Sequence, residues 1–166
     1  MKASNSYIDI TVNVPASTKV WHFAVILADV WLGENVSIGS HCEIGRGSVI
    51  HQGSRIGKGV FLPSASRVGE NVFIGPGTLF CDDKYPRVNN HNYIARPPRI
   101  DDGASIGAGC VILPGIHIGA GAMVGAGSVV VEDVPAGATV YGDAARLVHS
   151  FSTSQDDSLE TSPSEA

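Results

Sequence analysis

The sequence has few charged residues, few aromatic residues and few cysteines. Charged residues make up 16% and aromatic residues 7% of the 166-residue chain. The three cysteines, Cys42, Cys81 and Cys110, are odd in number and widely spaced, which argues against a disulfide framework or a zinc knuckle and favours a reducing compartment. No apolar run approaches the roughly 18 residues of a membrane-spanning helix, and the N-terminus lacks a signal-peptide layout. We therefore expect a soluble, cytoplasmic protein that does not bind membranes.

Basic residues are also scarce, and the acidic excess lies at the C-terminal end. The net charge is −5, and residues 149–166 hold four acidic residues with no lysine or arginine, which leaves −1 for residues 1–148. This balance does not favour nucleic acid as a partner. The composition predicts one folded domain over residues 1–148, followed by a disordered acidic tail over 149–166.

The sequence is rich in glycine and has an apolar period of six. Apolar residues occupy every sixth position from Ile8 to Phe80, and the column resumes at Ile100 and continues to Val130. Small residues recur two positions before this column, and glycine recurs one position after it. Because residues two apart share a face of a β-strand, both apolar and small columns point inward. Three positions after the apolar column, glycine or asparagine recurs, which suits corners with positive φ.

A short strand and a corner in every six residues predict an all-β, flat-sided solenoid with three faces and about six turns. An α-helix is excluded because a spacing of six matches neither 3.6 nor 3.5 residues, and because glycine is costly inside helices. We expect a short C-terminal extension over roughly residues 132–148 after the last repeat.

Over residues 8–131 the pattern resembles the left-handed parallel β-helix of the hexapeptide-repeat acyltransferases. The left hand comes from this resemblance, since the general crossover preference suggests the opposite. The resemblance also implies a homotrimer with active sites between neighbouring prisms.

The repeat is interrupted once, by a loop over residues 81–99. The segment has four basic and two acidic residues, with two tyrosines and a histidine. Guanidinium and ammonium groups suit phosphates, and aromatic rings can cover a base or a sugar. A long loop in a regular solenoid is usually functional, so we predict a substrate-binding loop, with a merely solvated insertion as the alternative. The candidate substrate-binding residues are Asp83, Lys84, Tyr85, Arg87 and Arg96.

Two segments narrow the resemblance to one branch of the family. Trp21-His22-Phe23 and Asp83-Lys84-Tyr85-Pro86-Arg87 resemble motifs of nucleotide-linked 3-amino-sugar N-acetyltransferases, and shorter similarities lie at 73–76, 103–108 and 142–146. Those enzymes transfer acetyl from acetyl-CoA to the amino group of UDP- or dTDP-linked sugars. The resemblance therefore implies this activity here. The alternatives are O-acetylation of a sugar hydroxyl and a non-catalytic β-helix scaffold.

The sequence leaves three alternatives for the general base: either of two loop residues, or no general base at all. Asp82 stands where the resembled family carries asparagine near the acceptor amine, so it either removes the proton or only orients the sugar. Many hexapeptide-repeat acyltransferases use a histidine, which makes His91 the second candidate. His117 points outward and could reach a neighbouring subunit's cleft. Three other histidines are interpreted as structural or surface groups, namely His22, His41 and His51.

In the family, the pantetheine arm of CoA lies along the coils beside small residues. The resemblance therefore places acetyl-CoA, a co-substrate, at Gly107, Ala108, Gly125 and Ala126, with Arg146 as partner of a CoA phosphate. Solenoid geometry by itself is an equally good reason for these glycines. No histidine pair has the spacing of a hexapeptide-repeat zinc site, so we expect no metal.

Overall fold

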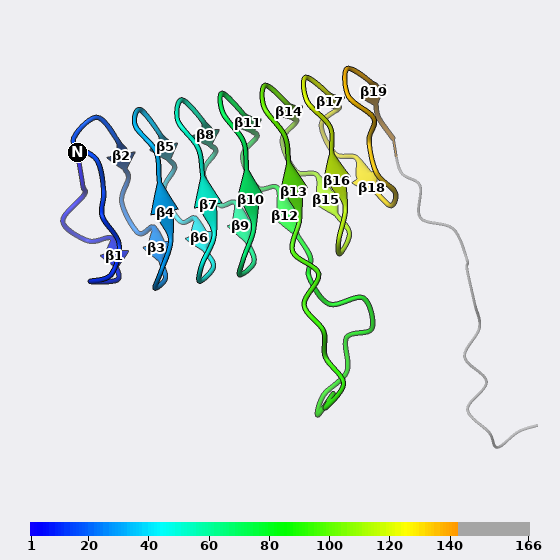
Figure 1. Cartoon of the computed structure of the whole chain (residues 1–166), viewed down its shortest axis with the longest axis horizontal. Helices are drawn as coiled ribbons and strands as arrows, with labels where there is room; N and C mark the ends of the chain where they lie inside the picture. Colours follow the sequence, from blue (N-terminus) through cyan, green and yellow to red (C-terminus); the bar gives the residue numbers. More distant parts are fainter. Residues whose placement is uncertain (143–166) are drawn as a thin grey trace, which may run out of the picture.

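The computed structural model describes residues 1–142 as a parallel β-solenoid (Figure 1). Its strands are two residues long, and they lie on three sheets that run along the axis. The strands are β1 (Tyr7–Ile8), β2 (Lys19–Val20), β3 (Val25–Ile26), β4 (Trp31–Leu32), β5 (Ser37–Ile38), β6 (Glu43–Ile44), β7 (Val49–Ile50), β8 (Arg55–Ile56), β9 (Phe61–Leu62), β10 (Arg67–Val68), β11 (Phe73–Ile74), β12 (Leu79–Phe80), β13 (Arg99–Ile100), β14 (Ser105–Ile106), β15 (Val111–Ile112), β16 (His117–Ile118), β17 (Met123–Val124), β18 (Val129–Val130) and β19 (Thr139–Val140). The predicted acidic tail, the end of the predicted extension and Arg146 lie outside the described residues.

The chain visits the three sheets in turn. Sheet A has the order β2-β5-β8-β11-β14-β17-β19, sheet B the order β1-β3-β6-β9-β12-β15-β18, and sheet C the order β4-β7-β10-β13-β16. Neighbouring strands are parallel and in register, so that Arg99 pairs with His117 and Ile100 with Ile118. The predicted all-β solenoid is confirmed, with seven strands in each of sheets A and B and hence about seven turns.

The turn count of about six was slightly low because the extension continues the solenoid. Val134 forms a bridge with Ile118, and β19 pairs with β17. At the other end, Val14 belongs to the six-residue column but lies outside any strand and is only half-buried. The apolar period thus identifies the interior positions, while pairing at the two ends depends on the neighbouring coil.

The interior is a stack of aliphatic side chains. From β2 to β18 the second residue of each strand is buried and the first is not. The largest fully buried side chains are Phe80, Leu62 and ten isoleucines. The small inward column is also satisfied, because Ser54 Oγ donates to the carbonyl of Gly69 (2.7 Å) and Cys42 Sγ to that of Gly57 (2.8 Å). Among residues 1–142, no buried side-chain nitrogen or oxygen lacks a hydrogen-bond partner.

The corners have the backbone conformation that the sequence pattern predicts. Gly53 has a φ of 72° and Asn71 a φ of 53°. Glycine and asparagine adopt this left-handed conformation at low steric cost. The regular corners keep each strand directly above its predecessor, which fixes where every outward side chain lies.

Candidate active site

The loop is the main departure from regular geometry. It spans residues 81–98, since Arg99 belongs to β13, and it leaves the solenoid at the edge shared by sheets B and C (Figure 1). Its stem is held by backbone hydrogen bonds. Arg96 N donates to Asp82 O (2.9 Å), and Gly115 N donates to Arg96 O (2.8 Å). The second bond attaches the loop to the next coil.

Asp82 is half-buried at the beginning of the loop, where a tyrosine contacts it. Tyr93 donates its hydroxyl hydrogen bond to Asp82 Oδ2 (2.7 Å). This hydrogen bond raises the pKa of Tyr93 to about 12, with smaller contributions from desolvation and from the charges of Asp82 and Asp83. Asp83 Oδ1 accepts a hydrogen bond from Tyr85 N (2.9 Å). The two carboxylates therefore organise the loop itself.

The other predicted loop residues are exposed. Lys84 Nζ lies 5.7 Å from the centroid of the Tyr85 ring, within the range of a cation–π contact. Arg87 donates to the carbonyl of Pro86 (2.9 Å), and Arg96 is exposed at the stem. His91 is also exposed, and it makes no side-chain hydrogen bond or ion pair with a residue in the described part of the chain. The loop thus presents cationic and aromatic groups to solvent.

The residues predicted to bind CoA lie elsewhere on the solenoid. Gly107 and Gly125 follow strands β14 and β17 of sheet A, and Ala108 and Ala126 lie at the edge between sheets A and B. A Cβ on Gly107 would lie 2.6 Å from the Cα of Ala126. A Cβ on Gly125 would lie 2.8 Å from the Cβ of Tyr141. Coil stacking therefore accounts for the absence of a side chain at both glycines.

Within a single chain, the loop and these small residues lie apart. The loop leaves at the edge between sheets B and C, whereas Ala108 and Ala126 lie at the opposite edge of sheet B. The width of sheet B separates the two groups. Within a single chain they do not form one pocket.

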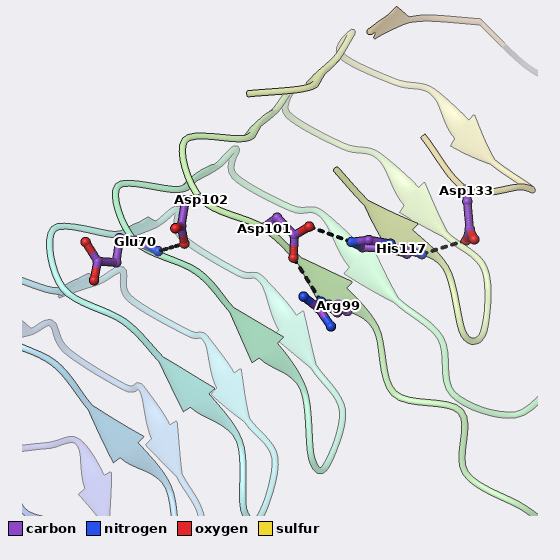
Figure 2. Close-up of polar contacts among 6 residues, drawn as sticks. All are labelled: Glu70, Arg99, Asp101, Asp102, His117 and Asp133. Carbon is purple, nitrogen blue, oxygen red and sulfur yellow. Dashed lines mark hydrogen bonds and ion pairs between the residues drawn. The ribbon is translucent and has the colours of Figure 1, made fainter. Parts of the chain in front are cut away.

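A polar cluster on the outer face of sheet C was not predicted as a unit. His117 Nε2 lies 2.7 Å from Asp101 Oδ2, and Arg99 Nε donates to Asp101 Oδ1 (2.9 Å), as Figure 2 shows. The hydrogen bond from Arg99 is the largest cause that lowers the pKa of Asp101, and His117 adds to it. Asp133 Oδ1 accepts a hydrogen bond from the backbone N of His117 (2.8 Å).

The sequence held a signal for this cluster. Sequence reasoning placed His117 on the outer surface but did not identify its partners. One full coil of three six-residue repeats separates Arg99 from His117, and the two are paired in the structure. Applying the period to polar residues as well as to apolar ones would have placed Arg99 beside His117, with Asp101 two residues further along the same coil as Arg99.

In residues 1–142, no three histidine, cysteine, aspartate or glutamate side chains are close enough to hold a metal ion. Across the same residues there is no helix of the length and apolar character that would span a membrane.

Comparison with known proteins gives the class of the chain. The bacterial transferase hexapeptide family (six repeats) matches residues 4–46 and 97–131, and the hexapeptide repeat of succinyl-transferase matches residues 30–63. Together they cover more than half of the sequence. The chain belongs to the hexapeptide-repeat transferases.

Several individual proteins are similar to it. The 2,3,4,5-tetrahydropyridine-2,6-dicarboxylate N-acetyltransferase of Staphylococcus aureus (strain JH9) is 38% identical over 66 residues, which are 40% of this chain and 28% of the relative. PerB of Caulobacter crescentus, solved with CoA and GDP-perosamine, has a TM-score of 0.57 and 25% identity, over 82% of this chain and 54% of that one. UDP-N-acetylglucosamine acyltransferase of Francisella novicida shares the fold, with a TM-score of 0.52 and 15% identity over 85% of this chain and 66% of that one. The chain spans about half the length of PerB and less of the curated relative.

Proposed function

We propose that the protein is an acetyl-CoA-dependent N-acetyltransferase that acts on the amino group of a nucleotide-linked amino sugar. The observation that carries the proposal is the loop over residues 81–98, which adds exposed cationic and aromatic side chains to a hexapeptide-repeat solenoid. Such groups suit a diphosphate and a sugar or base. The similarity to PerB, solved with CoA and a nucleotide-linked sugar, supports this substrate class.

The proposed enzyme is a homotrimer, because the two parts of the site lie on different edges of sheet B. One part is the loop, and the other is the pair of small residues Ala108 and Ala126. The outer face of this sheet is largely apolar, and Leu79 is 43% exposed and Tyr7 56% exposed. Apolar area of this kind is typical of an interface between subunits. The outward residues of the sheet B face include Tyr7, Val25, Phe61, Leu79, Val111 and Val129.

Three-fold symmetry brings the two halves together. In a cyclic trimer with sheet B facing the axis, the edge between sheets B and C of one subunit meets the edge between sheets A and B of the next. The loop of one subunit then lies beside Ala108 and Ala126 of its neighbour. Sheet C of the first subunit and sheet A of the second form the walls of the cleft.

In this cleft the amino group of the sugar attacks the thioester carbonyl of acetyl-CoA. The C–N bond forms, the C–S bond breaks, and backbone N–H groups or dipoles stabilise the oxyanion. Lys84, Tyr85, Arg87 and Arg96 are proposed to bind the nucleotide sugar. Asp82 and His91 are the loop residues proposed to accept or direct the proton.

A thiol-release assay tests the function. Acetyl-CoA is incubated with UDP-, dTDP- and GDP-linked amino sugars, and with the matching sugars that carry hydroxyl groups only. Release of CoA with the amino sugars alone supports N-acetylation, and release with hydroxyl sugars favours the O-acetyltransferase. No release with either would contradict both activities and favour the scaffold.

Oligomeric state is a separate test of the same proposal. Sedimentation equilibrium at micromolar protein is expected to give the mass of a trimer. Leu79→Arg, which places a charge on the sheet B face, is expected to give monomers without activity, whereas Tyr85→Arg on the loop should stay trimeric. A stable and active monomer would refute the intersubunit site.

A further inference from the structure

A groove with positively charged and aromatic side chains lies on the N-terminal half of sheet A. Two adjoining hollows form it, and they share Trp21 and Arg55. Lys19 lines the first hollow, and Lys58 and Phe73 line the second. These five residues define the sheet A groove. Trp21 is 41% exposed and Phe73 40% exposed, so aromatic surface lies open to solvent between the positive charges.

The positive charges of the groove have no partners. In the described part of the chain, the side chains of Lys19, Arg55 and Lys58 make no hydrogen bond and no ion pair. The outward arginines of sheet C differ, because Arg67 donates to backbone carbonyls and Arg99 donates to a carboxylate. Unpaired cations that gather on one exposed face attract a negatively charged partner.

The remainder of sheet A is uncharged on its outer face. The outward residues of β14, β17 and β19 are Ser105, Met123 and Thr139, and none of the described strands of this sheet has an acidic outward residue. Positive charge is therefore confined to the N-terminal half of the face. An acidic segment that follows the sheet meets no repulsion before it reaches the groove.

The C-terminal end of the same chain has the complementary chemistry. Residues 149–166 contain Asp156, Asp157, Glu160 and Glu165, with no lysine or arginine. Leu159 stands between two of these acidic residues. The segment thus offers an apolar side chain flanked by negative charges, and the groove offers aromatic rings flanked by positive charges. Complementary charge of this kind gives specificity and sets the register of a contact.

The chain leaves the solenoid at the end of the sheet that holds the groove. The described residues end at Gly142, two residues after β19, and Figure 1 shows β19 in one row with β17, β14, β11 and β8. Four strand spacings separate β19 from β8, or about 19 Å. Asp156 follows Gly142 by 14 residues, which span at most about 46–50 Å. The segment is therefore long enough to reach the groove of its own chain.

We propose that residues 149–166 bind the sheet A groove of the same chain. The carboxylates of Asp156, Asp157 and Glu160 contact the groove cations, and Leu159 contacts the rings of Trp21 and Phe73. Exposed ion pairs are individually weak, but attachment to one chain gives the segment a high effective concentration at the groove. The contact should weaken with salt, because salt screens exposed charges.

The contact has a consequence for substrate binding. Sheet A is one wall of the cleft in the proposed trimer, so a segment on the groove occupies part of that cleft. Its negative charge competes with the diphosphate of a nucleotide sugar. This consequence rests on the proposed function, whereas the contact itself does not.

Zero-length cross-linking of the full-length protein tests the contact. A carbodiimide joins a carboxylate to a lysine amine that touches it. Trypsin releases residues 147–166 as one peptide, because no lysine or arginine follows Arg146, and mass spectrometry then identifies the lysine attached to it. We expect Lys19 and Lys58 to take at least about fivefold more of this peptide than Lys84, an exposed lysine of the loop. The product should have the mass of one chain under denaturing conditions.

Two perturbations identify charge as the cause. Arg55→Gln should lower the cross-link to Lys58 at least about threefold, as should a rise from about 50 to about 500 mM NaCl. Arg46→Gln is the matched control, because Arg46 is an exposed arginine at the edge between sheets B and C. It should leave the cross-link unchanged. Each variant is first checked for wild-type Tm and oligomeric state.

Fluorescence quenching gives a second readout without cross-linking. Trp31→Phe leaves Trp21 as the single tryptophan, and iodide, an anion, quenches it. Replacing the four acidic residues of the segment by amides should uncover the cations and raise iodide quenching at least about twofold. Asparagine at Ser150, Ser152, Ser162 and Ser164 is the matched control. It changes as many positions and keeps the charge, so quenching should stay at its original level.

Turnover tests the consequence separately. With the nucleotide sugar that the wild type acetylates, the four-amide variant should have a KM at least about threefold lower at about 50 mM NaCl, with kcat within about twofold. An unchanged KM would overturn the competition with substrate. If the wild type releases no CoA with any sugar, the proposed function fails and the cross-linking result still decides the contact.

Three results would overturn the contact itself. The first is cross-linking of the segment to Lys84 as often as to Lys19 and Lys58. The second is a product with the mass of two chains, which would place the segment on a neighbouring subunit. The third is iodide quenching of Trp21 that does not change when the acidic residues are replaced.

Discussion

Gly107→Ala separates the structural role of this glycine from a role in binding CoA. The new Cβ would lie 2.6 Å from the Cα of Ala126 in the next coil. Real Cβ atoms do not approach backbone so closely, and a backbone held in a regular stack cannot move aside as a flexible side chain can. Overpacking usually costs about 1–3 kcal/mol. Because the obstacle is backbone, we expect a loss of about 3 kcal/mol, and therefore a fall in Tm of about 6–12 °C.

Gly109→Ala is the matched control for this substitution. A Cβ there meets nothing within 4 Å, but the φ of Gly109 is +67°, which is unfavourable for alanine. The expected cost is about 1 kcal/mol, or about 2–4 °C in Tm. Both substitutions reduce the entropy of the unfolded chain equally. The difference between them therefore measures the contact with Ala126.

Thermal unfolding followed by circular dichroism gives the two Tm values, at one protein concentration because association shifts Tm. Calorimetric titration with CoA, well below both transitions, gives the Kd of each variant. Equal Tm values for the two variants would refute the stacking argument. If Gly107→Ala also bound CoA more weakly while keeping its Tm, the glycine would be needed for the ligand and not for the coil.

Three further outcomes follow from the geometry of the chain. Phe80→Ala removes a fully buried ring and should lower stability by about 3–5 kcal/mol, measured by denaturant unfolding; a loss below 1 kcal/mol would contradict its place in the core. Ala65→Gly, at an exposed corner with a φ of 61°, relieves a left-handed alanine and should raise Tm by about 1–3 °C; a lower Tm would show that the corner is not strained. In a spectrophotometric titration Tyr93 should ionise at about 12, because its hydroxyl donates to Asp82, and Asp82→Asn should lower that pKa. An unchanged midpoint would show that the hydrogen bond is absent in solution.

The fold could be predicted from the sequence because both features of the pattern, the inward apolar residue and the corner residue, are specified within each six-residue repeat. The six-residue apolar column specifies which side chain of each repeat points inward, and the glycine or asparagine at the corner specifies the turn. Neither depends on residues far away in the chain. The prediction missed β19 because Thr139–Val140 is out of phase with the column and pairs only through β17.

The site was predictable only in part. The loop was recognised as an interruption of the period, and its boundary was wrong by one residue at Arg99. The contact between Tyr93 and Asp82 was not predicted, because a loop outside the repeat has no periodicity that relates its side chains. The contact between His117 and Asp101 joins residues sixteen apart in sequence, and it exists only because successive coils stack in register.

The sequence by itself therefore determined the solenoid, its inward and outward positions and the place of the loop, since a period of six leaves one arrangement of strand and corner that buries the apolar column. Tertiary structure decided which outward residues become neighbours. It put the loop and the small residues after β14 and β17 on opposite edges of sheet B, and it put Asp101 beside His117 on sheet C. The physical reason is that burial of apolar side chains is specified within each repeat, whereas polar contacts on the surface depend on the register between coils.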